Sequence, residues 1–259
     1  MNRLVEGIER LVANTPLDAF ARWTWSQFNS IGRPRARQSM RYDQHTRQIM
    51  VKVLKRSSNC VDVGCHRGSV LISMIKTAPQ GTHHAFEPIP GLASMLRQRF
   101  PTVDIHEIAL SDTQGHASFQ HVVSQPGYSG FRRMGYVPQS AEVAEIRVRV
   151  DTLDHVLPPD LPIAFIKIDV EGAQLQVLKG AKRTITKYRP YIVFEHGMSA
   201  AKSYGTRSEE VFDFLFLECG LRISLLDDWL NGRPPLERGA FAASVGHFAG
   251  SEFVFLAHP

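Results

Sequence analysis

The chain has 259 residues and a mass of 29.1 kDa, and 43% of its residues are hydrophobic and 21% charged. This composition excludes a disordered or collagen-like chain, and the length fits one large globular domain. No apolar run reaches the roughly 20 residues that cross a bilayer. We find no signal-peptide pattern in the first 20 residues, and the three cysteines form no CxxC pair. We therefore expect a soluble, cytoplasmic protein.

The positive charge is concentrated at the front of the chain. Residues 1–60 hold eleven basic and four acidic residues, whereas residues 61–259 hold 19 basic and 21 acidic ones. We predict a basic helical extension over 1–57 and a domain over 58–259. Apolar residues at helical spacing in 4–12 and aromatic residues in 20–28 predict an amphipathic helix that packs on the domain or closes over a site. A solvated basic helix and peripheral membrane contact stay open, nucleic acid is less favoured, and the oligomeric state is unknown.

From residue 59, short β-branched runs alternate with helical stretches, which is typical of a parallel sheet covered on both faces. The sequence predicts an α/β domain. The expected strands are 60–63, 83–87, 104–108, 164–168 and 191–195, with 221–226 and 252–257 completing the sheet, and the expected helices lie near 68–77, 90–99, 172–187 and 207–219. Glycines and prolines interrupt residues 113–150, where we expect a functional loop or a hairpin excursion.

The first motif, from Asp62 to Gly68, lies where a strand turns into a helix. Gly64 and Gly68 let the backbone turn tightly and approach a ligand, and the free amides of the helix start favour polar groups. Asp62 would repel a pyrophosphate, but it can hold the ammonium group of an amino acid. The pattern therefore favours S-adenosylmethionine over NAD, with a tight turn that binds nothing as the alternative.

The second motif is Glu87 and Pro88, which follow the second strand. A carboxylate at this position can accept both hydroxyl groups of a ribose, as in dinucleotide-binding folds. With Asp62 at the other end, both ends of a nucleoside cofactor would be held. The alternative is that Glu87 only caps the helix after Pro88.

Two further strands end in acidic residues. Asp169 and Glu171 follow the fourth strand, and Glu195 ends the fifth with His196 directly after it, at the sheet edge where ligands of open α/β sheets bind. Histidine can take a proton near neutral pH, and a neighbouring carboxylate can orient it or share a metal with it. The alternatives are helix capping by the acids and a backbone-bonded loop position for His196.

Taken together, these motifs resemble the FkbM family of S-adenosylmethionine-dependent methyltransferases. The resemblance rests on five segments in order: 62–68, 86–88, 109–112, 152–154 and 167–173. It implies a class I Rossmann-like fold, with a seven-stranded, mostly parallel sheet and helices on both faces. It also implies methyl transfer to an oxygen of a small molecule, such as a hydroxyl on a polyketide, sugar or glycolipid.

The resemblance also implies roles for single residues. Asp62, Gly64 and Gly68 would line the methionine part of the cofactor, Glu87 the ribose, and the segment with Ala109, Ser111 and Asp112 the adenine. Asp169 and Glu171 would face the methyl-transfer site, and His66, Pro88 and Asp169 are also expected to bind the cofactor. Two positions depart from the family pattern. Cys65-His66 replaces the usual Ala-Asn, and Gln174 replaces a glutamate after the DxEG box.

The mechanism follows from the chemistry of methyl transfer to an alcohol. The reaction needs in-line alignment and a base, or a metal, that takes up or acidifies the hydroxyl proton. We predict that Asp169 and His196 act together as that base, with Glu171 and Glu195 orienting them or sharing a divalent ion. The rival functions are an RNA methyltransferase and a non-catalytic nucleoside-binding protein.

Overall fold

The computed structural model describes residues 34–246 and 253–259. The chain divides into two units, residues 1–43 and 44–259, and helix α3 (Pro34–Val53) begins in the first and ends in the second. The domain boundary expected between residues 57 and 58 stays a prediction. The amphipathic helix expected over 4–12 and the aromatic cluster over 20–28 lie outside the described residues.

The second unit is built on a seven-stranded sheet with the order β3-β2-β1-β7-β8-β10-β9. The first five strands of this order are parallel, and β10 runs antiparallel to both of its neighbours. The strands are β1 (Asn59–Val63), β2 (His83–Phe86), β3 (Asp104–His106), β7 (Ile163–Ile168), β8 (Tyr191–His196), β9 (Arg222–Leu225) and β10 (Phe253–His258). This confirms the predicted fold class. The strand order reverses direction at β1, whose neighbours are β2 and β7. Ligands of open α/β sheets bind beside such a reversal, the switch point, so we expect a ligand beside the carboxyl end of β1.

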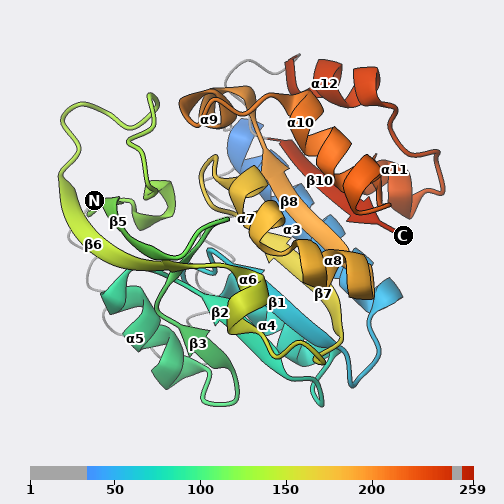
Figure 1. The fold of residues 1–259 in the computed structure, drawn as a ribbon, viewed down its shortest axis with the longest axis horizontal. Helices are drawn as coiled ribbons and strands as arrows, with labels where there is room; N and C mark the ends of the chain where they lie inside the picture. The colour runs from blue at the N-terminus through green and yellow to red at the C-terminus, as the bar shows by residue number, and fades with distance from the viewer. Residues whose placement is uncertain (1–33, 247–252) are drawn as a thin grey trace, which may run out of the picture. The chain divides into compact units, whose positions relative to one another are not determined.

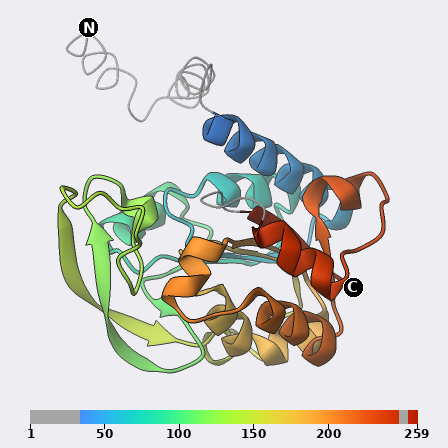
Figure 2. The ribbon, with the colours of Figure 1, turned by 90° about the horizontal axis from the view of Figure 1, so that it is seen from above.

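Helices cover both faces of this sheet. In Figure 2, α4 and α5 lie on one side of the sheet, and α7, α8 and α10 lie on the other. The described helices in the second unit are α4 (Ser69–Thr77), α5 (Pro90–Arg99), α6 (Leu153–Val156), α7 (Gln174–Gly180), α8 (Lys182–Tyr188), α9 (Met198–Ser203), α10 (Ser208–Asp213), α11 (Leu226–Leu230) and α12 (Arg238–Gly246), with a 3₁₀ turn at Pro126–Tyr128 and a π-helical turn at Phe214–Glu218. The helix expected over 172–187 is two helices that meet at Ala181.

The segment 113–150 is a hairpin excursion. Strands β5 (Gly115–Val122) and β6 (Val143–Asp151) pair antiparallel along their whole length, and β4 (Ala109–Leu110) joins β6 to make a second, three-stranded sheet. Figure 1 shows this long hairpin outside the main sheet. The loop between its strands, residues 123–142, is the part that reaches the candidate site.

The main core fills the space between the sheet and the helices α7, α8, α10 and α12, which cover one of its faces. Val63, Ile168 and Phe194 point into it from three neighbouring strands, and Phe241 of α12 lies across from them. Successive strand residues point to opposite faces. The residues between these positions, such as Asp62 and Lys167, therefore point to the face covered by α4.

Candidate active site

The turn after β1 depends on two glycines. Gly64 and Gly68 have φ angles of +73° and +76°, the left-handed region that L-residues with a side chain avoid. A Cβ on Gly64 would also overlap the carbonyl oxygen of Asp169. The backbones that follow β1 and β7 therefore touch at the switch point, and only glycine allows this contact.

The backbone amides of this turn bond within the protein. Gly64 and Cys65 donate to the carbonyl oxygen of Phe86, at 3.0 and 3.2 Å, and Gly68 donates to Cys65. The His66 amide donates to Oε2 of Glu87 at 3.0 Å. These four amides are therefore used within the protein, and three of them hold the turn to Phe86 and Glu87 at the end of β2. The free amides expected at the start of α4, which begins at Ser69, stay a prediction.

Glu87 lies directly beyond the end of β2 and is 4% exposed. Oε2 accepts from His66, and Oε1 accepts from the amide of Ile89 at 3.0 Å. Burial raises the pKa of the Glu87 carboxyl to about 7, although these two amides act in the opposite direction. A carboxylate offers about four acceptor positions, so two remain for other donors. The capping role and the ribose role are compatible, and Pro88 leads from this carboxylate into α5.

Asp62 is buried on the α4 face and lies beside a lysine that the motif reading did not single out. Asp62 on β1 pairs in register with Lys167 on β7, and the two are 2% and 7% exposed. Burial raises the pKa of the Asp62 carboxyl to about 7, and Lys167 lowers it in part. Oδ2 of Asp62 has no hydrogen-bond partner among the described residues. A lysine within an apolar strand could have indicated this pair from the sequence, because a buried cation needs acidic partners.

Asp169 and Glu171 follow β7. Oδ2 of Asp169 lies 3.3 Å from Nζ of Lys167, and its side chain is 38% exposed, so the Asp169 carboxylate is both paired and accessible. Glu171 has a positive φ of 47° and accepts a hydrogen bond from the hydroxyl group of Tyr136. Tyr136 belongs to the 123–142 loop, so the hairpin excursion reaches the acidic end of β7.

His196 does not join this acidic group. It is 1% exposed, its Nε2 lies 3.0 Å from Oγ of Ser208, and its ring stacks on Phe241 with the centroids 5.7 Å apart. Burial lowers the pKa of His196 to about 4. Adjacent strand residues point to opposite faces, so His196 lies on the core face and Glu195 on the face of Lys167. The expected pairing of Asp169 with His196 as a base is therefore corrected: His196 is placed as a core residue.

We expect His196→Gln to lower the free energy of unfolding at pH 7 by about 1 to 3 kcal/mol, because the buried hydrogen bond to Ser208 and the ring contact with Phe241 are lost. In wild type, the unfolded state gains a proton near the ordinary pKa of 6.5, while folded His196 stays neutral until about pH 4. Stability from this residue is thus lost as the pH falls from 6.5 to 4. Urea unfolding at several pH values should show the gap between the two proteins narrowing over that range. A gap that stays constant with pH would contradict the assignment.

The segment expected at the adenine lies on the second sheet. Ala109 belongs to β4, and its side chain packs in an apolar cluster with Ile89, two residues beyond Glu87. Ser111 follows β4, donates its amide to the carbonyl oxygen of Asp151, and donates its hydroxyl to Asp112 at 3.2 Å. Contact of this segment with adenine stays a prediction.

Of the three residues that depart from the family pattern, Cys65 and Gln174 are buried and His66 is partly buried. Cys65 is buried, and burial raises the pKa of its thiol. Nε2 of His66 is buried without a hydrogen-bond partner among the described residues, and burial lowers the pKa of this ring. Gln174 is buried in the first turn of α7. In the described ranges, no group of three or more His, Cys, Asp or Glu side chains is placed to hold a metal ion.

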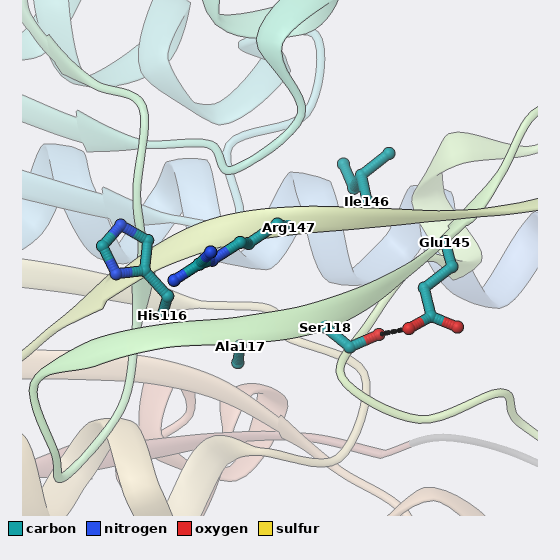
Figure 3. A pocket seen from close by; sticks show the side chains of 6 residues that line it. All are labelled: His116, Ala117, Ser118, Glu145, Ile146 and Arg147. Carbon is teal, nitrogen blue, oxygen red and sulfur yellow. Dashed lines mark hydrogen bonds between the residues drawn. The ribbon is translucent and has the colours of Figure 1, made fainter.

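A shallow hollow lies elsewhere, on the outer face of the hairpin, and Figure 3 shows its lining. His116, Ser118, Glu145 and Arg147 in its lining are exposed, and the carboxylate of Glu145 accepts a hydrogen bond from Ser118 at 2.6 Å. None of the predicted site residues lines it, so it does not compete with the switch point as the site.

The geometry can be compared with known proteins. Residues 62–223 match the methyltransferase FkbM domain, and this match spans every motif from Asp62 to His196. The chain belongs to the FkbM methyltransferase family. A relative by sequence is the 2-O-methyltransferase NoeI of Sinorhizobium fredii (strain NBRC 101917 / NGR234), 28% identical over 158 residues, which are 55% of this chain and 65% of NoeI.

An FkbM methyltransferase from Methylobacillus flagellatus KT has a similar crystal structure, with a TM-score of 0.50 and 16% identity over 80% of this chain and 45% of that one. The FkbM chain described here thus spans less than two thirds of either relative. The shared fold is the class I methyltransferase fold that the motifs predicted. None of the described helices is both long and apolar enough to cross a membrane.

Proposed function

We propose that this protein is an S-adenosylmethionine-dependent O-methyltransferase that acts on a hydroxyl group of a small molecule, with sugars and glycolipids as the first acceptor class. The observation that supports it is the meeting of Asp62, Glu87 and Asp169 at the carboxyl ends of β1, β2 and β7, beside the switch point. Membership of the FkbM family and the name of NoeI favour the same reaction.

The residues at this edge fit the cofactor. Asp62 offers a buried oxygen without a partner, which suits the ammonium of the methionine part, and His66 offers an unpartnered ring nitrogen. Glu87 bonds the amides of His66 and Ile89 and retains two acceptor positions that suit ribose hydroxyls. When bound, S-adenosylmethionine supplies an electrophilic methyl group on a sulfonium.

The protein's own residues would position and deprotonate the acceptor. Asp169 is the accessible carboxylate at the end of β7, and Lys167 holds it in place by an ion pair. It is therefore our candidate for the base that takes the hydroxyl proton. Glu171, fixed by Tyr136 of the 123–142 loop, would orient the acceptor from the other side.

Calorimetric titration with S-adenosylmethionine tests the cofactor assignment. We expect micromolar binding by wild type and at least about tenfold weaker binding by Glu87→Gln, because an amide can accept from fewer ribose hydroxyls than a carboxylate. Glu87→Gln keeps the shape of the side chain and one acceptor oxygen for the amides of His66 and Ile89, whereas Glu87→Ala would release both amides.

Each outcome of the titration separates two functions. Binding that depends on Glu87 justifies a screen of glycosides with free hydroxyl groups as methyl acceptors. No binding by folded wild type would overturn the enzyme assignment in favour of a non-catalytic protein. Transfer to RNA and not to glycosides would keep the reaction but overturn the acceptor class.

A further inference from the structure

The loop between β5 and β6, residues 123–142, contacts the acidic end of β7 at two points. The hydroxyl group of Tyr136 donates a hydrogen bond to Glu171. A Cβ placed on Gly130 would lie 3.6 Å from Cβ of Glu171, so the loop backbone passes directly beside this residue. Glu171 follows Asp169, our candidate base, by two residues. The loop is therefore placed to contact an acceptor whose hydroxyl group reaches Asp169.

This loop is packed on the protein. Its residues Met134 and Val137 form a buried apolar cluster with Ala200 of α9. In its first half, Gln120 and Gly130 exchange two backbone hydrogen bonds of 2.8 and 3.2 Å. Side chains of the loop are thus presented from a packed support, which a residue that selects a substrate requires.

Tyr128 is an exposed aromatic residue of this loop. Its ring meets the ring of Tyr136 edge to face, with the centroids 5.6 Å apart and the planes at 69°. This contact holds the ring of Tyr128 in place and leaves the residue 41% exposed. Because Tyr136 also bonds Glu171, one aromatic ring separates Tyr128 from the acidic end of β7.

An exposed aromatic ring close to carboxylates suits a sugar. The rim of a pyranose ring carries hydroxyl groups, which donate to carboxylates such as those of Asp169 and Glu171. Its faces carry C–H bonds, whose slightly positive hydrogens favour the negative face of an aromatic ring. An acyclic polyol has no such face, and a purely apolar alcohol has no further hydroxyl groups, so neither uses both features.

We propose that Tyr128 is a specificity-determining residue whose ring stacks on the C–H face of a pyranose acceptor while a hydroxyl group of that sugar lies at Asp169. The inference rests on the proposed function and narrows its acceptor class to a pyranose ring. It assigns the selection of the acceptor to the 123–142 loop.

The test measures KM and kcat of the full chain for the methyl glycosides of glucose, galactose and mannose, from the release of S-adenosylhomocysteine at saturating cofactor. We expect Tyr128→Ser to raise the KM for the best of these acceptors about tenfold, because the stacking contact is lost. The kcat should stay within about twofold, since this contact is the same before and during methyl transfer.

Two further variants separate the ring from its other properties. Tyr128→Phe keeps the ring and should keep the KM within about twofold of wild type. Tyr128→Leu keeps an apolar side chain without a flat ring, and we expect its KM to rise at least about threefold. The affinity of each variant for S-adenosylmethionine, measured by calorimetry, should match wild type and shows that the variant is folded.

Phe216→Ser is the matched control. Phe216 is 47% exposed, and its ring lies 5.5 Å from that of Phe212, so its surroundings resemble those of Tyr128. The turn that carries Phe216 leads into the start of β9, which runs parallel to β8, so it lies toward the opposite, amino edge of the sheet. This variant should keep both KM and kcat within about twofold of wild type.

The outcomes are distinct. A KM of Tyr128→Ser within twofold of wild type overturns the proposal, as does a rise in KM as large for Tyr128→Phe as for Tyr128→Ser. If Tyr128→Ser does not fold, the Phe and Leu variants decide in the same way. Wild type that binds S-adenosylmethionine but methylates none of the three glycosides overturns the pyranose acceptor and leaves the cofactor assignment intact. Wild type that does not bind S-adenosylmethionine overturns the proposed function itself.

Discussion

Asp169→Asn is expected to lower the rate of methyl transfer by about 10² to 10⁴-fold, the usual contribution of a general base. The asparagine keeps the size of the side chain but cannot take up the hydroxyl proton. Single-turnover rates at saturating cofactor, measured on an acceptor found in the screen, give the effect on the chemical step. The affinity for S-adenosylmethionine should fall by less than about tenfold, because the other cofactor contacts remain.

The matched control is Asp160→Asn, a change of the same kind at an exposed position before β7, where the carboxylate pairs with Lys187. Its transfer rate should stay within about twofold of wild type, since surface changes away from a site have small effects. A fully active Asp169→Asn variant would remove Asp169 from the base role and leave Glu171 as the remaining candidate.

Gly64→Ala is expected to destabilise the fold by at least about 2 kcal/mol and to abolish cofactor binding. The left-handed backbone costs a side chain about 1 to 2 kcal/mol. The new Cβ would also overlap the carbonyl oxygen of Asp169 and push apart the ends of β1 and β7. For a domain of this size we expect the melting temperature to fall by about 4 to 8 °C.

Gly91→Ala provides the comparison. Gly91 lies in α5, where an added Cβ meets nothing within 4 Å, so we expect this change to stabilise the protein by about 0.5 to 1 kcal/mol. Thermal unfolding and calorimetry on both variants measure the two effects. A Gly64→Ala protein that melts and binds like wild type would contradict the close contact at the switch point.

Most of the residues at the carboxyl edge of the sheet could be predicted from the sequence, because their positions follow from local patterns. A β-branched run followed by an acid or a glycine identifies both a strand and its carboxyl end, and parallel strands bring those ends to one edge. This reasoning places Asp62, Glu87 and Asp169 correctly at that edge. It could not place His196, because one step along a strand reverses the direction of the side chain and the strand's exact end was unknown.

The sequence could not predict contacts between distant segments either. Tyr136 reaches Glu171 across 35 residues, and only the hairpin's path shows that its loop arrives at the end of β7. Lys167 is one strand residue among others in the sequence, and only the register of β1 with β7 shows that it pairs with Asp62. Its charge matters only through that pairing.

The sequence by itself determined the fold class, the family and the edge of the sheet where the chemistry belongs, because hydrophobic periodicity and short motifs act over a few residues. The tertiary structure decided which side chains meet. It placed His196 in the core, brought Tyr136 to Glu171, and set Lys167 beside Asp62 and Asp169, because side-chain direction and strand register depend on how the whole sheet pairs.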